Sequence, residues 1–130
     1  RVLKKGGKAV FVEPLPYNPI INIYRKKAQS VRTKTETPIK FTEIKLMKKI
    51  FTEVSHKEFW FLTLAIFVWF YIVEKADPSK VRYWKKIIKE AEKYKYSFYI
   101  LNTIDRFILK IFPFLRRFCW NTVLVFKAPL

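Results

Sequence analysis

The sequence predicts a mainly α-helical protein, built on one transmembrane helix and without an independent globular core. Three observations predict this fold class. Fifteen consecutive residues, Phe59 to Val73, carry no charge. The rest of the 130-residue chain is strongly basic, with 27 Lys and Arg against 10 Asp and Glu and a formal net charge of +17. Only two glycines occur, which argues against sandwiches, barrels and nucleotide-binding loops, because these folds need turns with φ > 0.

Residues 1–36 are predicted to form an extended basic arm. Prolines at positions 14, 16 and 19, in the segment EPLPYNP, exclude a regular helix there. The apolar run Val10 to Val12 is suited to adding a short strand to a partner. The basic residues that follow show no apolar periodicity. An arm of this composition has little to bury against itself, so we expect it to become ordered on a partner.

Residues 37–76 are predicted to form one long helix. Thr37 is a plausible N-cap, and Pro38 suits the first helical position. Apolar side chains then recur at helical spacing and alternate with lysines. They are Ile44, Met47, Ile50, Phe51 and Val54. No helix-breaking residue separates this amphipathic stretch from the charge-free run, so the helix is expected to continue through both.

The transmembrane part of this helix is predicted at about 57–75. Ten of its fifteen charge-free residues are Leu, Ile, Phe or Val, which sums to about −3 to −6 kcal/mol of insertion free energy. The run is about 22 Å long as a helix, against about 30 Å of hydrocarbon. Flanking lysines and the interface anchors Trp60, Trp69 and Tyr71 are expected to make up the difference. The alternative is a buried core helix, but no other segment is apolar enough to cover it on every side.

Residues 77–112 are predicted to form a basic amphipathic helix lying on the membrane surface. Asp77 and Pro78 suit its N-cap and first position. Its apolar stripe runs from Val81 to Phe98 and includes Trp84 as a further interface anchor. The opposite side is expected to contact anionic lipid headgroups through Arg82, Lys85, Lys86, Lys89 and Lys93. The alternative is the solvated face of a helix packed on protein.

Residues 113–130 are predicted to form a kinked helix end and an extended tail. Pro113 is expected to kink the helix, which then ends near Trp120 and is followed by an extended segment at 123–126. Arg116 and Arg117 are further candidates for headgroup contact. A second span at 96–115 is disfavoured, because charges at Asp105 and Lys110 cost roughly 2.5–3.5 kcal/mol each at the centre of a bilayer.

The residues needed for catalysis are scarce. His56 is the sole histidine and Cys119 the sole cysteine, and no cluster has metal-ligand spacing. The run KKGGK lacks the GxxxxGK[ST] spacing of a phosphate loop. We therefore expect no enzymatic activity, no metal, no small-molecule substrate and no catalytic cofactor.

The EPLPYNP arm, the FWFLTLAIFVWFYIV run and the basic helix from Lys80 together resemble the single-span supernumerary subunits of mitochondrial respiratory complexes and ATP synthase. The resemblance is one of architecture, covers most of the chain loosely and includes no signature motif. It implies a non-catalytic accessory subunit, most directly of a respiratory-chain complex, that stabilises assembly and lipid packing. It also implies a single-pass location in the mitochondrial inner membrane, with other protein subunits, anionic lipid and structurally bound cardiolipin as partners.

The alternative function is an RNA-binding structural protein of a mitochondrial ribosome, and nucleic acid is an expected partner in this case alone. The net charge, the basic arm and the aromatic residues interleaved with Lys and Arg all favour RNA binding. The charge-free run argues against it, because RNA does not need such a segment and water does not tolerate it.

Overall fold

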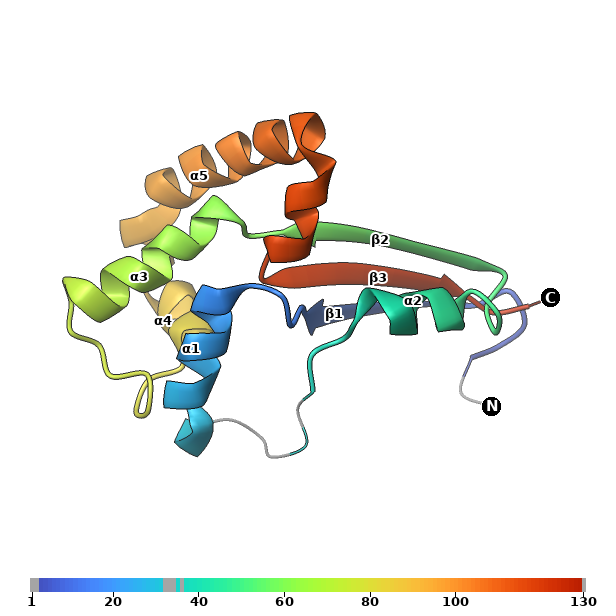
Figure 1. Ribbon diagram of the computed structural model, residues 1–130, viewed down its shortest axis with the longest axis horizontal. Helices are drawn as coiled ribbons and strands as arrows, with labels where there is room; N and C mark the ends of the chain where they lie inside the picture. The colour runs from blue at the N-terminus through green and yellow to red at the C-terminus, as the bar shows by residue number, and fades with distance from the viewer. Residues whose placement is uncertain (1–2, 32–34, 36, 130) are drawn as a thin grey trace.

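The computed structural model describes residues 3–31, 35 and 37–129. A three-stranded antiparallel sheet extends toward one end of the molecule, and most of the helices gather at the other end (Figure 1). The strands are β1 (Lys8–Pro14), β2 (Glu53–Phe59) and β3 (Asn121–Lys127). The helices are α1 (Pro19–Lys27), α2 (Phe41–Met47), α3 (Ala65–Ile72), α4 (Tyr83–Lys89) and α5 (Ala91–Ile111), with short 3-10 helices η1 (Gln29–Val31), η2 (Leu62–Leu64) and η3 (Pro113–Phe118).

The sheet has the strand order β1-β3-β2, so the last strand of the chain lies between the first two. Lys127 of β3 lies opposite Lys8 of β1 and Glu53 of β2. Side chains alternate between the two faces of a strand. In β3 the side chains of Thr122, Leu124 and Phe126 are buried, whereas those between them are half-exposed. The pairing of β1 with β3 brings segments near the two ends of the chain together, and the N–H of Gly6 donates to the carbonyl of Pro129 at 3.1 Å.

Helix α2 covers the buried face of the sheet. Its Ile44 packs with Leu124 and Phe126, and the ring of Phe51 stacks on Phe126 at 4.9 Å between centroids. The helix begins at Phe41, where the N–H of Lys40 donates to the Glu43 carboxylate at 2.6 Å, and it ends at Met47. The predicted continuous helix at 37–76 is therefore wrong, because the chain turns after α2 and residues 53–59 pair with β3.

The charge-free run does not form a transmembrane helix. Within the described residues, none of the helices combines the length and the apolar character needed to cross a bilayer. Phe59 ends β2, Trp60 has a positive φ of 66°, and only the eight residues of α3 are α-helical. The prediction of a span at 57–75 is wrong, and so is the single-pass location in the mitochondrial inner membrane that depended on it.

The break between β2 and α3 is held by Asp105 of α5. Its carboxylate accepts hydrogen bonds from the backbone N–H groups of Phe61, Leu62 and Thr63 at 3.0, 2.6 and 3.2 Å. It also accepts one from the Thr63 hydroxyl at 2.8 Å. These donors begin a helical turn and have no earlier backbone acceptor. The Asp105 carboxylate therefore takes the place of an N-cap side chain, although it belongs to the distant helix α5.

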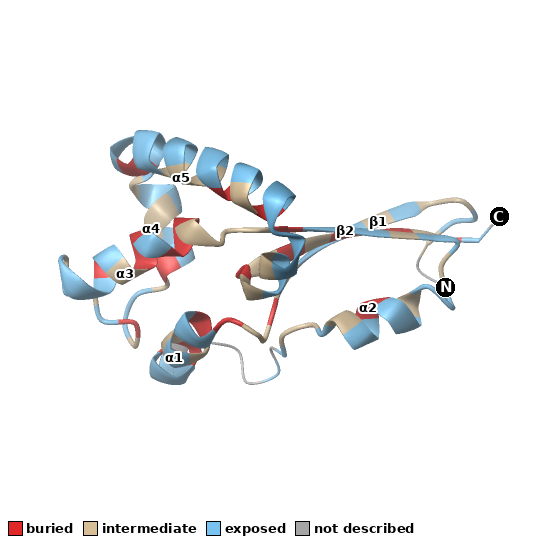
Figure 2. Ribbon diagram, turned by 45° about the horizontal axis from the view of Figure 1, so that its top comes forward, coloured by how far each residue is buried: buried red, intermediate tan, exposed pale blue. Residues whose placement is uncertain are grey.

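The principal core forms around α3, and this contradicts the predicted absence of a globular core. Phe67 makes an edge contact with Trp120 at 4.5 Å between ring centroids and another with Tyr83 at 5.5 Å. Ile21 and Tyr94 join the same cluster. The buried positions of α3, α4 and α5 are marked in Figure 2. The apolar run is thus covered by α1, α4, α5 and Trp120 before β3, all of them outside the run in the sequence.

The predicted extended arm at 1–36 contains a strand and a helix. Asn18 caps α1 by accepting from the N–H of Ile20 at 2.9 Å, and Pro19 takes the first helical position. Asn18 also donates to the carbonyl of Phe118 at 2.5 Å, which ties α1 to η3. Residues 1–2, 32–34 and 36 of the arm lie outside the described part of the chain.

The predicted basic helix from Pro78 begins later than expected. Asp77 accepts from the N–H and hydroxyl of Ser79, so it closes a turn there, and α4 begins at Tyr83. Helix α5 ends at Ile111, two residues before Pro113, and η3 follows. The tail segment expected to be extended, residues 123–126, lies within β3.

Candidate polyanion-binding surface

A basic concavity of about 770 Å³ lies along α4 and the loop that precedes it. Four of the predicted headgroup-contact residues line it, namely Arg82, Lys85, Lys86 and Lys89. Lys80 adds a fifth cation, and Ser30 and Ala76 complete the opposite rim. The short helix therefore places cations spaced three and four residues apart on one side, as the helical repeat requires.

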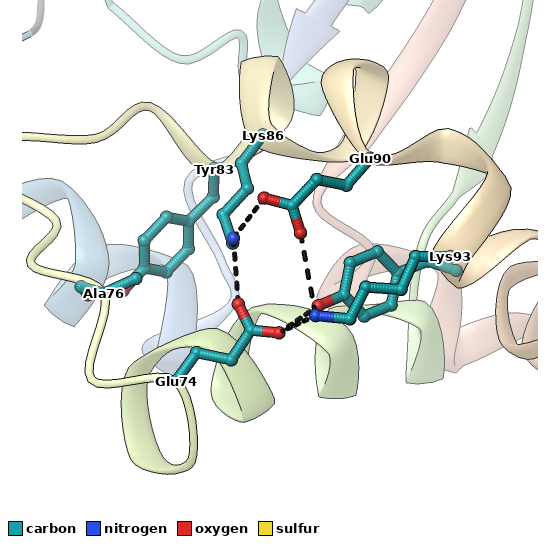
Figure 3. A network of polar contacts seen from close by, with 7 residues as sticks. Glu74, Ala76, Tyr83, Lys86, Glu90 and Lys93 are labelled. Carbon is teal, nitrogen blue, oxygen red and sulfur yellow. Dashed lines mark hydrogen bonds and ion pairs between the residues drawn. The ribbon is translucent and has the colours of Figure 1, made fainter.

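The position of α4 is set by an ion-pair network centred on Glu74, just after α3 (Figure 3). The Glu74 carboxylate accepts from Lys86 of α4 at 2.9 Å and from Lys93 of α5 at 2.8 Å, and the Tyr94 hydroxyl donates to it as well. Lys86 also pairs with Glu90 at 2.5 Å. The hydrogen bonds from Lys93, Tyr94 and Lys86 lower the pKa of Glu74 to about 2. This network joins the ends of three helices.

Two of the predicted headgroup contacts are consequently used inside the protein. Lys86 and Lys93 neutralise Glu74 and Glu90, so neither is free for an external anion. Hydrogen bonding to Glu74 raises the pKa of Lys93 and keeps it charged. The sequence predicted one basic helix for both lysines, whereas Lys86 lies in α4 and Lys93 in α5, and it did not show that both face carboxylates.

Tyr83 fixes the first turn of α4 against the core. Its side chain is almost fully buried, and its ring lies 4.9 Å from that of Tyr24 between centroids. Its hydroxyl donates to the carbonyl of Ala76 at 2.5 Å, which holds the loop that carries Lys80 (Figure 3). Burial raises the pKa of Tyr83 to about 12, so this hydrogen bond donor persists over the physiological pH range.

Of the remaining cations of the concavity, Arg82, Lys85 and Lys89 have no acidic partner among the described residues, whereas the charge of Lys80 is partly balanced by the nearby Asp77 carboxylate. Within the described residues, no carboxylate lies within 4 Å of Lys80, Arg82, Lys85 or Lys89. Lys85 instead lies 5.5 Å from the ring centroid of Trp84, which is 40% exposed. Glu90 is the carboxylate in the lining, and both Lys86 and Lys93 already neutralise it. The surface therefore presents three uncompensated positive charges, together with Lys80, on a fixed scaffold.

The other predicted contact residues lie elsewhere. Trp60 packs in the core beside Trp120, and Trp69 and Tyr71 lie on the exposed side of α3. Lys27 of α1 contacts the Tyr71 ring, with 4.4 Å from its Nζ to the centroid, and donates to its hydroxyl. Arg116 and Arg117 belong to η3, where Arg117 lies 5.8 Å from the ring centroid of Tyr17. The structure does not bring these residues into the α4 concavity.

One residue of the concavity carried no sequence signal. Ser30 of η1 donates its hydroxyl to the carbonyl of Ser79 at 2.6 Å and so closes the rim opposite α4. Its contribution depends on a contact between segments 49 positions apart. Lys80, by contrast, belongs to the run of basic residues that the sequence displays directly.

The single cysteine and the single histidine are both engaged in contacts within the fold. Cys119 is fully buried, and burial, together with nearby carboxylates, raises its pKa to about 12. His56 pairs with Glu58, which also accepts from the Thr122 hydroxyl. In the part of the chain that the structure describes, no three His, Cys, Asp or Glu side chains group to hold a metal ion. The chemistry that remains is that of the α4 concavity, whose cations can bind anions by charge and hydrogen bonding.

Comparison with known proteins gives no relative: no family model, no curated protein and no solved structure matches this chain.

Proposed function

We propose that this protein is a non-catalytic RNA-binding subunit of a ribonucleoprotein assembly, and that α4 and its preceding loop bind RNA phosphates. The observation that carries the proposal is the set of four cations, Lys80, Arg82, Lys85 and Lys89, around one concavity, of which the last three have no acidic partner among the described residues. Phosphate contacts of this kind supply most of the affinity of sequence-independent RNA binding.

The charge-free run no longer opposes this function. It argued against RNA binding because water would not tolerate it, but Leu64, Ile66, Phe67 and Phe70 are buried in the core. The remaining chain is rich in lysine and carries the net charge of +17. A protein of this charge attracts polyanions over distances up to the Debye length, about 8 Å at physiological salt.

The test is a salt titration of binding to a fluorescent single-stranded RNA of about 20 nucleotides, monitored by anisotropy. The triple variant Arg82→Gln, Lys85→Gln, Lys89→Gln removes three phosphate contacts. Each contact on single-stranded RNA contributes about 0.7 to the slope of log K against log salt, so the slope should fall by about 2. At 0.15 M salt the same loss corresponds to roughly fiftyfold weaker binding.

The matched control changes three exposed lysines at the other end of the molecule, Lys45, Lys48 and Lys49 of α2 and the turn after it, to glutamine. Both triple variants lower the net charge from +17 to +14. We expect the control to weaken binding by a much smaller factor. Equal losses in the two variants would show that net charge alone, and no surface on α4, accounts for binding.

A second candidate function is peripheral attachment to an anionic membrane surface, and the outward face of α5 favours it. Tyr96, Ile100, Ile104, Phe107 and Ile111 are all exposed and follow one helical face at spacings of four, four, three and four residues. Sedimentation with vesicles of phosphatidylcholine and phosphatidylserine tests it. Binding lost in the double variant Ile100→Ser, Phe107→Ser would favour the membrane, and absence of vesicle binding would leave RNA as the partner.

A further inference from the structure

A second cavity, of about 880 Å³, lies where the end of β2 meets α5 and η3. Aromatic side chains form part of its wall, namely Phe59 at the end of β2, Trp60 directly after it, and Phe98 of α5. The α4 concavity has a different lining, so the two sites are separate. The volume falls within the range of about 300–1,000 Å³ that is typical of small-molecule pockets.

Trp60 adopts a backbone conformation that bulky residues avoid. Its φ of 66° lies in the left-handed region, which is uncommon for a side chain of this size. The surrounding contacts hold it there, because its carbonyl accepts from the N–H of Trp120 at 3.0 Å and Asp105 binds the next three N–H groups. Strain retained in this way clusters at functional sites.

The rings at the cavity meet edge to face. Trp60 is perpendicular to Phe59, at 5.4 Å and 83°, and to Phe98, at 5.6 Å and 86°. All three are partly exposed. Such half-buried rings offer aromatic surface to a planar ligand, and Trp60 and Phe98 do so at little cost in side-chain entropy, since both already pack against the principal core.

The charges of the cavity favour an anionic ligand. Its two carboxylates are buried and already engaged, Asp105 by backbone N–H groups and Glu58 by His56 and Thr122. Four cations remain on the rim, all of them exposed, and none is ion-paired to a carboxylate of the described residues. They are Lys57, Arg106, Lys110 and Arg116.

We infer that this cavity binds one unstacked nucleotide of single-stranded RNA, with the base against the aromatic wall and the phosphate at the cationic rim. The inference deepens the proposed function and depends on it. Single-stranded RNA is recognised by aromatic stacking and by hydrogen bonds to base edges. Asn102 of α5 lines the cavity and supplies both an amide donor and an acceptor for a base edge. The α4 surface would then hold the backbone while this cavity detects the base.

The test compares oligoadenylate with an abasic RNA of the same length and charge, at equal salt, by fluorescence anisotropy. The measured quantity is the ratio of the dissociation constant of the abasic RNA to that of oligoadenylate. For wild-type protein we expect a ratio of about ten, the factor that one stacked base typically contributes. The variants Phe98→Leu and Asn102→Ala should lower this ratio, Phe98→Leu to about one. The circular dichroism spectrum of each variant checks that it is folded.

The α4 triple glutamine variant serves as the matched control, because it should weaken both RNAs by the same factor and preserve the ratio. A wild-type ratio near one with firm binding of both RNAs would overturn the base pocket and leave the proposed function intact. An unchanged ratio in both cavity variants would also overturn it. Absence of binding to either RNA would refute the pocket and the proposed function together.

Discussion

Replacing Asp105 by alanine should destabilise the protein severely, because one buried carboxylate satisfies four donors. Asp105 is 1% exposed, and three of its donors are the consecutive N–H groups of residues 61–63. A buried donor left without an acceptor costs about 1–3 kcal/mol. The donors lie beside the cavity at β2, so water can reach some of them. We therefore expect a total loss of about 3–5 kcal/mol, a large part of the roughly 5–15 kcal/mol that folded domains have.

Two further variants calibrate this loss. Asp105→Asn preserves the side-chain volume but turns one acceptor into a donor, so about half of the loss should remain. Thr103→Ala, two residues earlier on the exposed side of α5, removes a hydroxyl whose single hydrogen bond among the described residues is to the carbonyl of Tyr99. Exposed substitutions of this kind stay within about 0.5 kcal/mol of wild type.

The assay is urea denaturation followed by tryptophan fluorescence, since Trp60 and Trp120 both lie in the principal core. We expect the free energy of unfolding to be highest, and about equal, in wild type and Thr103→Ala, lower in Asp105→Asn, and lowest in Asp105→Ala. An Asp105→Ala protein within 1 kcal/mol of wild type would refute the view that this carboxylate organises the turn from β2 into α3.

Three other outcomes follow from the core and the ion-pair network. The pKa of Glu74 is about 2 in the folded protein against an ordinary 4.5, so its stabilisation is complete above pH 4.5 and is lost as the pH falls toward 2. Between pH 4.5 and pH 2 the free energy of unfolding should therefore decline less steeply in Glu74→Gln than in wild type. Cys119, fully buried and with a pKa raised to about 12, should resist iodoacetamide at pH 8 in the native state and react after unfolding in urea. Phe67→Ala should lower the free energy of unfolding by about 3–5 kcal/mol, because the Phe67 ring contacts Tyr83 and Trp120 in the core.

Local signals in the sequence did identify several features of the structure. The basic residues that line the α4 concavity form a visible run from Lys80 to Lys89. Pro113 is predicted to kink the helix, and in the structure α5 ends at Ile111 and the 3-10 helix η3 follows at Pro113–Phe118. The apolar segment at 123–126 is extended within β3. Each of these features has a signal that lies within a few residues along the chain.

The fold class was wrong because it depended on contacts between distant segments. A charge-free run is compatible both with a transmembrane helix and with a buried core segment. Which of the two forms depends on whether other segments of the chain cover the run. Here the cover comes from residues such as Ile21 and Trp120, which are respectively 46 positions before and 53 positions after Phe67. The interface-anchor role predicted for Trp60 was overridden in the same way, since Trp60 packs against Trp120.

The sheet and the second cavity were also beyond local reasoning. β1 pairs with β3 across more than 100 positions, and no turn signal connects strands so far apart. Asp105 reads in the sequence as the neighbour of Arg106, whereas in the structure it binds the turn at residues 61–63. The cavity beside it combines side chains of β2, α5 and η3, which only the folded chain assembles.

The most direct test of the central claim is the salt dependence of binding to single-stranded RNA by the wild-type protein. Four phosphate contacts at the α4 concavity and one at the rim of the cavity beside β2 predict a slope of log K against log salt of about −3.5, since each contact contributes about 0.7. A slope near this value, reduced by about 2 in the Arg82→Gln, Lys85→Gln, Lys89→Gln variant, is the expected result. Binding that is independent of salt, or the absence of binding at low salt, would contradict the account.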